Sequence, residues 1–395
     1  MAQMFRELAA RLRAKPRTGA VLGLLILAGA VAGGWAASER GHGPDAALAS
    51  GKVAFNVPAP PPPPPPADLQ ADLETLARGF KEDVGIAVTD VATGWTAQVN
   101  GETPYPQQSV SKLWVALATL EAVDRGQSNL DRVVQLGPDD RSVFYQPLGR
   151  RIRNSGGPEV SIRELLRWAI TESDNSANDK LMRELGGAEA VKAILTEKGL
   201  QDLRVGAYER DLQASVAGMT WRPEYGVDWA FQHARAQLPD YVRDNAMNAY
   251  LADPMDGAAP ADITRTLAAL HKGELLSPAS TQVFVDLLHQ TRTGPMRLKY
   301  GLPPGWQWGH KTGTGQDLRG YSVGINDVGL ATAPDGRVYA VAVMMRKTAK
   351  PIPARQAFFH QVSKAVARHW QASRTPGDPA PTFAAAPQPA GAGGQ

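Results

Sequence analysis

The order of expected strands and helices along the chain is the feature that most restricts its fold. Five segments have the composition and turn-bounded length of strands: 84–88, 96–99, 306–314, 321–332 and 338–345. Segments with helical spacing of apolar residues lie between these two groups of strands, and one more helix stands at each end. This order predicts an α+β fold with an antiparallel five-stranded sheet, flanked by the two terminal helices, beside an all-helical subdomain.

The start of the chain has the composition of a targeting segment. Basic residues up to Arg17 precede an uncharged, mostly apolar run over 18–38. Residues 1–38 are therefore predicted to be a signal peptide or a signal anchor. We favour an uncleaved membrane anchor, which places the rest of the chain outside the cytoplasm, in the periplasm or its equivalent. Cleavage of the segment and secretion is the alternative.

The remaining boundaries follow from changes in composition. Three segments are expected: a proline-rich linker at 39–67, a folded domain at 68–372, and a Pro/Ala/Gly tail at 373–395. An unbroken proline run in the linker favours a stiff polyproline II spacer. The tail is expected to be disordered, because it has too few apolar residues to form a core.

Charge and cysteine content exclude several classes of function. The chain has 42 Lys and Arg, 39 Asp and Glu, a formal net charge of +3 and no cysteine. Its basic residues are spread out after residue 18, so no nucleic-acid partner is expected. Disulfides and thiolate metal sites are excluded. Because no metal-ligand or phosphate-loop motif is present either, no metal or cofactor is predicted. The protein is expected to be a monomer.

Ser109 and Lys112 lie three residues apart at the start of an expected helix. The following Leu113, Ala116 and Leu117 have the spacing of one buried helix face. Residues three apart share a side of a helix, and scarce water beside an apolar face disfavours the ammonium form of a lysine. Such a lysine can accept the proton of a serine hydroxyl. The pair is a candidate nucleophile and base, with a capping serine and a surface lysine as the alternative.

A second motif, Ser-Asp-Asn, directly follows another expected helix. The hydroxyl of Ser173 could relay a proton to a leaving nitrogen, and the amide of Asn175 could orient a lysine and hold a substrate amide. A turn or a helix cap is the alternative interpretation. Ser176 and Asn178 offer a rival pair three residues later.

A third motif, Lys-Thr-Gly-Thr, ends the expected strand at 306–314. A cation and hydroxyls at a sheet edge, here Lys311, Thr312 and Thr314, can hold a substrate carboxylate. Gly313 is expected to keep the backbone open for an extended ligand. An ordinary exposed edge lysine is the alternative.

In this order the motifs S-x-x-K, S-x-N and K-T-G resemble those of the penicilloyl-serine transferase superfamily, over about residues 68–372. Within that superfamily the chain is most similar to class A β-lactamases. The resemblance implies that Ser109 is the acylated nucleophile and Lys112 its base or proton relay. Ser173 would pass a proton to the leaving nitrogen, and Asn175 would position Lys112 and the substrate.

The resemblance also implies how a substrate is held. Lys311, Thr312 and Thr314 would bind its carboxylate, together with Arg319, whose spacing only approximates that of the family's arginine. The backbone N–H groups of Ser109 and Thr314 would form the oxyanion hole.

Hydrolysis of the acyl-enzyme in class A enzymes uses a glutamate and a bound water. Glu209 stands near the position where that glutamate is expected, with Glu224 as the less favoured substitute. Gln213 and Ala207 replace the asparagine and the arginine of the family's pattern, so a charge pair that helps to fix this loop is missing. The surplus length of the chain is expected at 219–260, whose aromatic residues are predicted to form a satellite core.

The function predicted from these residues is that of an exported serine β-lactamase. It would act through a Ser109 acyl-enzyme, with deacylation assisted by Glu209. One alternative is a penicillin-interacting, D,D-peptidase-like serine hydrolase that acts on peptidoglycan peptides. The other is a catalytically inactive module that binds the cell wall.

Overall fold

The computed structural model describes residues 61–152 and 156–374. The predicted signal or anchor at 1–38, most of the linker at 39–67 and nearly all of the tail lie outside these described residues. In the described ranges, none of the helices has the length and apolar character needed to span a membrane.

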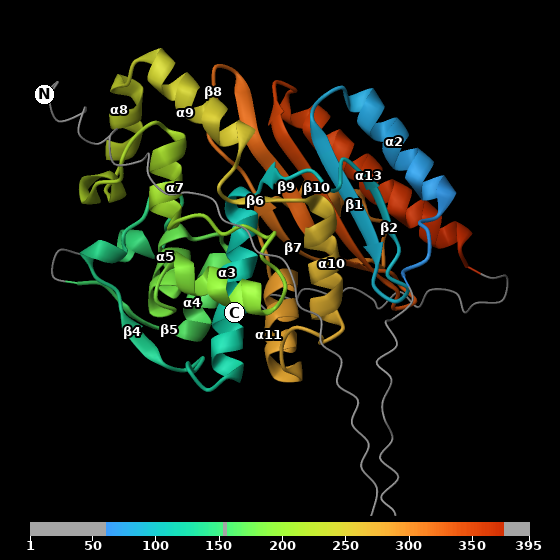
Figure 1. Ribbon diagram of the computed structural model, residues 1–395, viewed down its shortest axis with the longest axis horizontal. Coiled ribbons are helices and arrows are strands. Elements are labelled where there is room, and N and C mark those ends of the chain that lie inside the picture. The colour runs from blue at the N-terminus through green and yellow to red at the C-terminus, as the bar shows by residue number, and fades with distance from the viewer. Residues whose placement is uncertain (1–60, 153–155, 375–395) are drawn as a thin grey trace, which may run out of the picture. The chain divides into compact units, whose positions relative to one another are not determined.

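The main sheet is antiparallel, with the strand order β2-β1-β10-β9-β7 (Figure 1). Its strands are β1 (Val84–Asp90), β2 (Thr96–Val99), β7 (Gln307–Gly313), β9 (Tyr321–Thr332) and β10 (Val338–Thr348). A two-residue strand, β8 (Asp317–Leu318), also pairs with β9. The predicted five-stranded antiparallel sheet is confirmed, with β8 as a short addition at one end.

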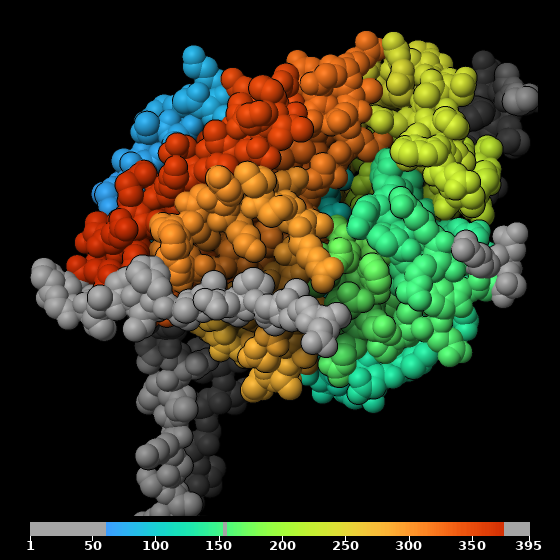
Figure 2. All heavy atoms as spheres, turned by 180° about the vertical axis from the view of Figure 1, so that it is seen from behind, coloured from blue at the N-terminus to red at the C-terminus, as the bar shows by residue number. Residues whose placement is uncertain are grey.

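The two terminal helices cover one face of this sheet. α2 (Ala67–Phe80) and α13 (Ile352–Ala372) lie side by side, as the blue and red regions of Figure 2 show. Phe80 stacks on Phe358 with ring centroids 4.3 Å apart. Leu73 of α2 and Val362 of α13 are fully buried in the same apolar cluster as these rings. The flanking terminal helices that the sequence predicts are therefore confirmed.

The opposite face of the sheet packs against α10 (Pro260–His271) and α11 (Pro278–His289). Successive side chains of a strand point to opposite faces. Along β10, Ala340 and Ala342 accordingly join the core beneath these helices, whereas Val341 joins the core beneath the terminal helices. The sheet is buried on both faces, which explains the nearly continuous apolar run of β10.

The remaining helices form the predicted helical subdomain beside the sheet (Figure 1). They are α3 (Lys112–Asp124), α4 (Ile162–Thr171), α5 (Asn175–Glu184), α6 (Ala188–Glu197), α7 (Glu209–Val216), α8 (Ala230–Gln237) and α9 (Asp240–Ala252). Short elements join these parts: β3 (Tyr105–Pro106), β4 (Val133–Gln135), β5 (Glu159–Ser161), β6 (Gly257–Ala258) and α12 (Leu298–Gly301). Single 3-10 turns occur at Gln108–Ser111, Pro138–Asp140, Gly149–Arg151 and Pro223–Gly226.

α3 is the central helix of the subdomain. Every residue from Lys112 to Leu120 is buried, so the expectation of a single buried face is wrong for this helix. A helix that is apolar almost all round belongs inside a protein rather than on its surface. The burial of α3 fixes the position of Lys112, the only charged side chain in its first two turns.

The surplus segment 219–260 contains α8 and α9. Trp221, Tyr225 and Phe231 pack with Ala214 in a small separate cluster, as the sequence predicts. Two other aromatic residues of the segment do not belong to a core: Trp229 and Tyr241 are each 67% exposed. The prediction of a satellite core is therefore right for Trp221, Tyr225 and Phe231 and wrong for Trp229 and Tyr241.

Candidate active site

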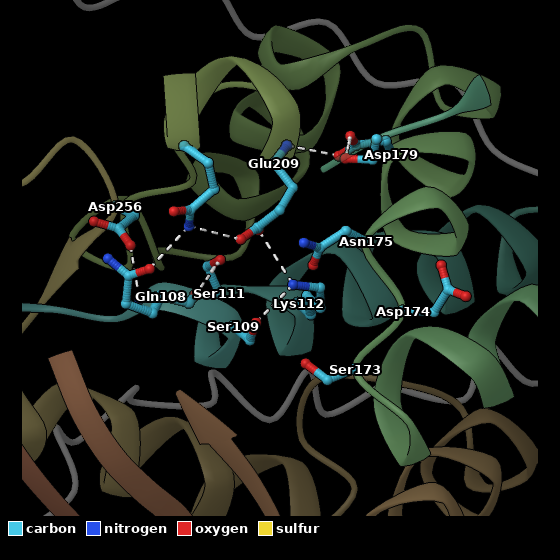
Figure 3. Close-up of polar contacts among 12 residues, drawn as sticks. Gln108, Ser109, Ser111, Lys112, Ser173, Asp174, Asn175, Asp179, Glu209 and Asp256 are labelled. Atoms are coloured by element: carbon cyan, nitrogen blue, oxygen red, sulfur yellow. Dashed lines mark hydrogen bonds and ion pairs between the residues drawn. The ribbon is translucent and has the colours of Figure 1, made fainter. Parts of the chain in front are cut away.

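Ser109 lies in the 3-10 turn Gln108–Ser111, which leads directly into α3. Lys112 is fully buried and donates a hydrogen bond from Nζ to Ser109 Oγ at 2.8 Å (Figure 3). The predicted helical turn thus brings the serine and the lysine into direct contact. Since the lysine is anchored by the buried helix, its amine is held against the hydroxyl without exposure to bulk water.

Glu209 reaches the same lysine from the other side. It is the first residue of α7, it is buried, and its Oε2 lies 3.2 Å from Lys112 Nζ (Figure 3). Its Oε1 accepts a hydrogen bond from Gln213 Nε2 at 3.0 Å. The alternative, Glu224, is exposed and lies 3.9 Å from Arg222. Lys112 is therefore placed between a serine hydroxyl and a carboxylate.

The backbone of Glu209 is fixed by a buried aspartate on α5. Asp179 Oδ1 accepts a hydrogen bond from the Glu209 N–H (Figure 3), and its Oδ2 accepts one from Ser142 Oγ at 2.7 Å. Burial raises the pKa of Asp179 to about 6. This clamp holds the first turn of α7 against the helical subdomain.

Ser173 pairs with the second lysine. Lys311 Nζ donates to Ser173 Oγ at 2.9 Å and to the Thr312 carbonyl at 3.0 Å. Ser173 adopts a left-handed backbone conformation with a φ of 60°, which is uncommon for a residue with a side chain. Burial, followed by the nearby Lys112, lowers the pKa of Lys311 well below its ordinary value. A second serine–lysine pair thus lies beside the first.

Asn175 begins α5, which Asp174 caps by accepting a hydrogen bond from the Ala177 N–H at 2.9 Å. The Asn175 amide donates to the Val143 carbonyl at 2.7 Å, and Figure 3 shows this side chain beside Lys112. The rival Ser176 is fully buried and donates to Gln146 at 2.8 Å, away from the two lysines.

Arg297, which the sequence reasoning did not select, lies at the end of the third motif. Its Nη2 donates to Thr314 Oγ1 at 2.6 Å and its Nη1 donates to the Gly313 carbonyl at 2.8 Å. Thr312 Oγ1 lies 2.7 Å from Thr293 Oγ1. No helical or strand periodicity marks Arg297 in the sequence, because only the turn before α12 brings it back to the end of β7.

The placement expected for Arg319 is wrong. Its guanidinium lies 2.8 Å from Asp244 and 3.0 Å from Asp240, both on α9, and about half of its side chain is exposed. Two carboxylates of the surplus segment therefore hold this arginine away from the third motif. Arg297 supplies the guanidinium there instead.

The reason expected for Gly313 also needs correction. A Cβ atom at this position would lie 2.3 Å from the Gln107 carbonyl oxygen and 3.0 Å from Asn326 Nδ2. The glycine thus allows the end of β7 to pack against the segment that carries Ser109. It serves close backbone packing within the protein rather than access for a ligand.

The side chains meet at an open cleft of about 490 Å³, a size that suits a small organic molecule. Six of the predicted site residues line it: Ser109, Ser173, Asn175, Glu209, Thr312 and Thr314. Tyr145, Arg235 and Arg297, which sequence reasoning did not select, line it as well. Within the described ranges, no cluster of His, Asp and Glu side chains is suited to hold a metal ion.

The site contains a serine hydrogen bonded to a buried lysine, a second serine–lysine pair and a buried carboxylate. Together these groups define a serine hydrolase site of the acyl-transfer class. The chain belongs to the beta-lactamase enzyme family, whose model matches residues 68–370.

Named relatives agree with this assignment. The chain is 25% identical over 298 residues to beta-lactamase VEB-1 of Pseudomonas aeruginosa, and the aligned region covers 75% of this chain and 88% of VEB-1. It is 27% identical over 298 residues to the extended-spectrum beta-lactamase PER-1 of the same organism, and the aligned region covers 75% of this chain and 85% of PER-1. Among solved structures, an ancestral class A beta-lactamase is 31% identical, with a TM-score of 0.60 over 76% of this chain and 99% of that one.

Proposed function

We propose that this chain is a serine β-lactamase that hydrolyses the β-lactam amide through an acyl-enzyme on Ser109. The observation that carries the proposal is the contact of the buried Glu209 carboxylate with Lys112, which itself donates a hydrogen bond to Ser109. The family membership and the β-lactamase names of the relatives support it. A carboxylate in this position can serve the hydrolysis of the ester as well as its formation.

In acylation, Ser109 Oγ attacks the β-lactam carbonyl carbon while its proton passes to Lys112 Nζ. The neighbouring Glu209 carboxylate stabilises the ammonium that forms. The backbone N–H groups of Ser109 and Thr314 would receive the developing oxyanion, and losing one such donor typically costs about 3 kcal/mol of barrier.

Breaking the C–N bond requires a proton on the leaving nitrogen. Ser173 Oγ would donate it and recover a proton from Lys311 Nζ, to which it is hydrogen bonded. The lowered pKa of Lys311 makes this amine a better proton donor than an exposed lysine. Asn175, which lines the same cleft, would bind the substrate amide.

In deacylation, Glu209 would take a proton from a water molecule as that water attacks the ester carbonyl, and Lys112 would return its proton to Ser109 Oγ as the ester bond breaks. Proton exchange with solvent then returns Glu209 to the carboxylate and Lys311 to the ammonium. Gln213 donates to Glu209 Oε1, so it helps to orient the carboxylate. The substrate carboxylate would lie against the hydroxyls of Thr312 and Thr314, beside the charge of Arg297 and the ammonium form of Lys311, which gives up its proton only as the C–N bond breaks. In this role Arg297 replaces the predicted Arg319.

The test is turnover of nitrocefin by the purified protein, with mass spectrometry to detect the acyl-enzyme. Steady hydrolysis is expected, with a stable adduct in Glu209→Gln and no adduct in Ser109→Ala. Glu224→Gln, at the exposed alternative glutamate, is the matched control and should behave as the parent does. A burst of one equivalent by the parent would favour a D,D-peptidase-like hydrolase, and no covalent adduct would favour an inactive wall-binding module.

We further propose that the protein is exported and remains membrane-anchored outside the cytoplasm through residues 1–38. The basic start and the uncharged apolar run in the sequence support this. Residues 1–67 fused to alkaline phosphatase, which is active only outside the cytoplasm, should give an active, membrane-bound enzyme. An inactive fusion would contradict export, whereas activity released from the membrane would point to cleavage.

A further inference from the structure

A chain of hydrogen bonds runs from Glu209 to α9, and the reaction described above does not use its far end. Gln213 Nε2 donates to Glu209 Oε1 and also to Gln108 Oε1 at 2.9 Å. Gln108 Nε2 donates to the Tyr250 hydroxyl at 2.5 Å, and this hydroxyl donates to Asp256 Oδ1 at 2.8 Å. All five side chains are buried, so their donors and acceptors must be satisfied within the protein.

The acceptor at the far end sets the direction of every bond in the chain. Above about pH 7 Asp256 is mainly ionised and only accepts hydrogen bonds, so Tyr250 must donate to Asp256 and can only accept from Gln108. Gln108 must then present its NH₂ group to Tyr250 and its carbonyl to Gln213. Gln213 must in turn present its NH₂ group, which also faces Glu209. The Glu209 carboxylate requires the same orientation of the Gln213 amide, so the Tyr250 hydroxyl and Glu209 hold that orientation from opposite ends of the chain.

Asp256 also holds the backbone next to the nucleophile. Its Oδ2 accepts a hydrogen bond from the Gln108 N–H at 2.7 Å (Figure 3). Gln108 has a left-handed φ of 53°, a strained conformation that persists only when its surroundings enforce it. Gly324 leaves room for its side chain, because a Cβ there would lie 2.6 Å from Gln108 Cγ. The fold therefore places the Gln108 amide in this position at the expense of local strain.

Tyr250 comes from the surplus segment 219–260. Its ring packs with Leu212 and Val216 of α7, in one small buried cluster. Ala207 stands where the resemblance expects an arginine, so the usual charge pair of this loop is missing. Tyr250 thus connects α9 to α7 through its ring and to the residue before the nucleophile through its hydroxyl.

We propose that Tyr250 is a positioning residue for deacylation. Its hydroxyl, hydrogen bonded to Asp256, joins Glu209 in holding the amides of Gln108 and Gln213 in the orientation in which Gln213 donates to the Glu209 carboxylate. The inference rests on the proposed function, because Glu209 is the group that activates the deacylating water. It assigns to α9 a part chiefly in the second half of the reaction, because there Glu209 itself takes a proton, whereas in acylation it only stabilises the Lys112 ammonium.

The test is the variant Tyr250→Phe, which removes the hydroxyl and keeps the ring. The deacylation rate constant, measured as loss of the adduct with a fluorescent penicillin, should fall about tenfold, since the change leaves buried amide and carboxyl groups unpaired. The acylation rate constant should stay within about twofold. Tyr241→Phe is the matched control, because Tyr241 lies on the same helix and is 67% exposed. It should match the parent in both steps.

Gln108→Met provides a second variant, because it keeps the length of the side chain and removes both amide contacts. It should also slow deacylation more than acylation. A folded Tyr250→Phe protein with the parent's deacylation rate would overturn the inference, and so would equal losses in both steps, which indicate a structural role. A parent without any adduct at Ser109 would overturn the proposed function first, and this inference with it.

Discussion

Replacing Arg297 by alanine should lower kcat/KM for β-lactams by about 10- to 100-fold. The guanidinium donates to the Thr314 hydroxyl at 2.6 Å and to the Gly313 carbonyl at 2.8 Å, and it lines the cleft. A hydrogen bond that involves a charged group contributes about 1.5–3 kcal/mol. Because about 1.4 kcal/mol corresponds to a factor of ten in rate, the loss of one such bond to the substrate carboxylate gives the stated range.

The assay compares two substrates that differ only in that carboxylate. Initial rates are measured with a cephalosporin and with its methyl ester, for the parent and for Arg297→Ala. The large loss is expected for the acid, and a loss of about threefold or less for the ester, which cannot form the charged contact. Arg319→Ala is the control for a missing arginine, since Asp240 and Asp244 hold Arg319 on α9. It should change neither rate by more than about twofold.

Two results would refute this reasoning. Equal losses for acid and ester would mean that Arg297 acts only by bonding the Gly313 carbonyl and holding the end of β7. A large loss of kcat/KM in Arg319→Ala, for the acid but not for the ester, would mean that Arg319 rather than Arg297 binds the substrate carboxylate.

Three other perturbations follow from the same contacts. Gly313→Ala should lower the free energy of unfolding by about 1–3 kcal/mol, because its Cβ would press on the Gln107 carbonyl; a urea midpoint equal to the parent's would contradict this. Arg235→Gln should raise KM several-fold more for β-lactams with an anionic side chain than for neutral ones, since Arg235 brings a cation from α8 to the cleft; equal changes would exclude that role. Burial raises the pKa of Asp256 to about 7 from 3.8, so its contribution to stability is complete below about pH 4 and is lost as pH rises towards 7. The free energy of unfolding should change by up to about 1.4 kcal/mol per pH unit in this range. Urea titrations at a series of pH values should show a smaller pH dependence for Asp256→Asn, whereas an unchanged dependence would show that other groups are responsible.

The contacts that depend on local geometry could be predicted from the sequence. Ser109 and Lys112 meet because three residues make almost one helical turn, whatever the rest of the fold does. The capping box of α4 is equally local, with Ser161 Oγ accepting from the Glu164 N–H at 3.2 Å. The contact of Ser173 with Lys311 is different, since the two residues lie far apart in the chain. Only the resemblance to a family indicated that they share a cleft.

The two arginines show why the rest of the site could not be predicted. Arg319 follows the third motif closely in the sequence, but it has a left-handed φ of 48° in the turn between β8 and β9. That turn directs it to the carboxylates of α9. Arg297 precedes the motif across an irregular segment, and its approach to Thr314 depends on how α12 packs against α13. Neither outcome is encoded in the residues next to the arginine.

The segment 219–260 acts on the site through three separate contacts rather than through the aromatic cluster of Trp221, Tyr225 and Phe231. It pairs with Arg319, it adds Arg235 to the cleft, and it places Tyr250 behind Gln108. Its α9 also covers apolar side chains of α7, the helix that begins with Glu209. A deletion of α8 and α9 would therefore remove a hydrogen-bond donor from the fully buried Asp256 and expose the helix that carries the deacylating carboxylate. For this reason we expect variants that remove the contacts of Tyr250 or Asp256 to affect deacylation before they affect acylation.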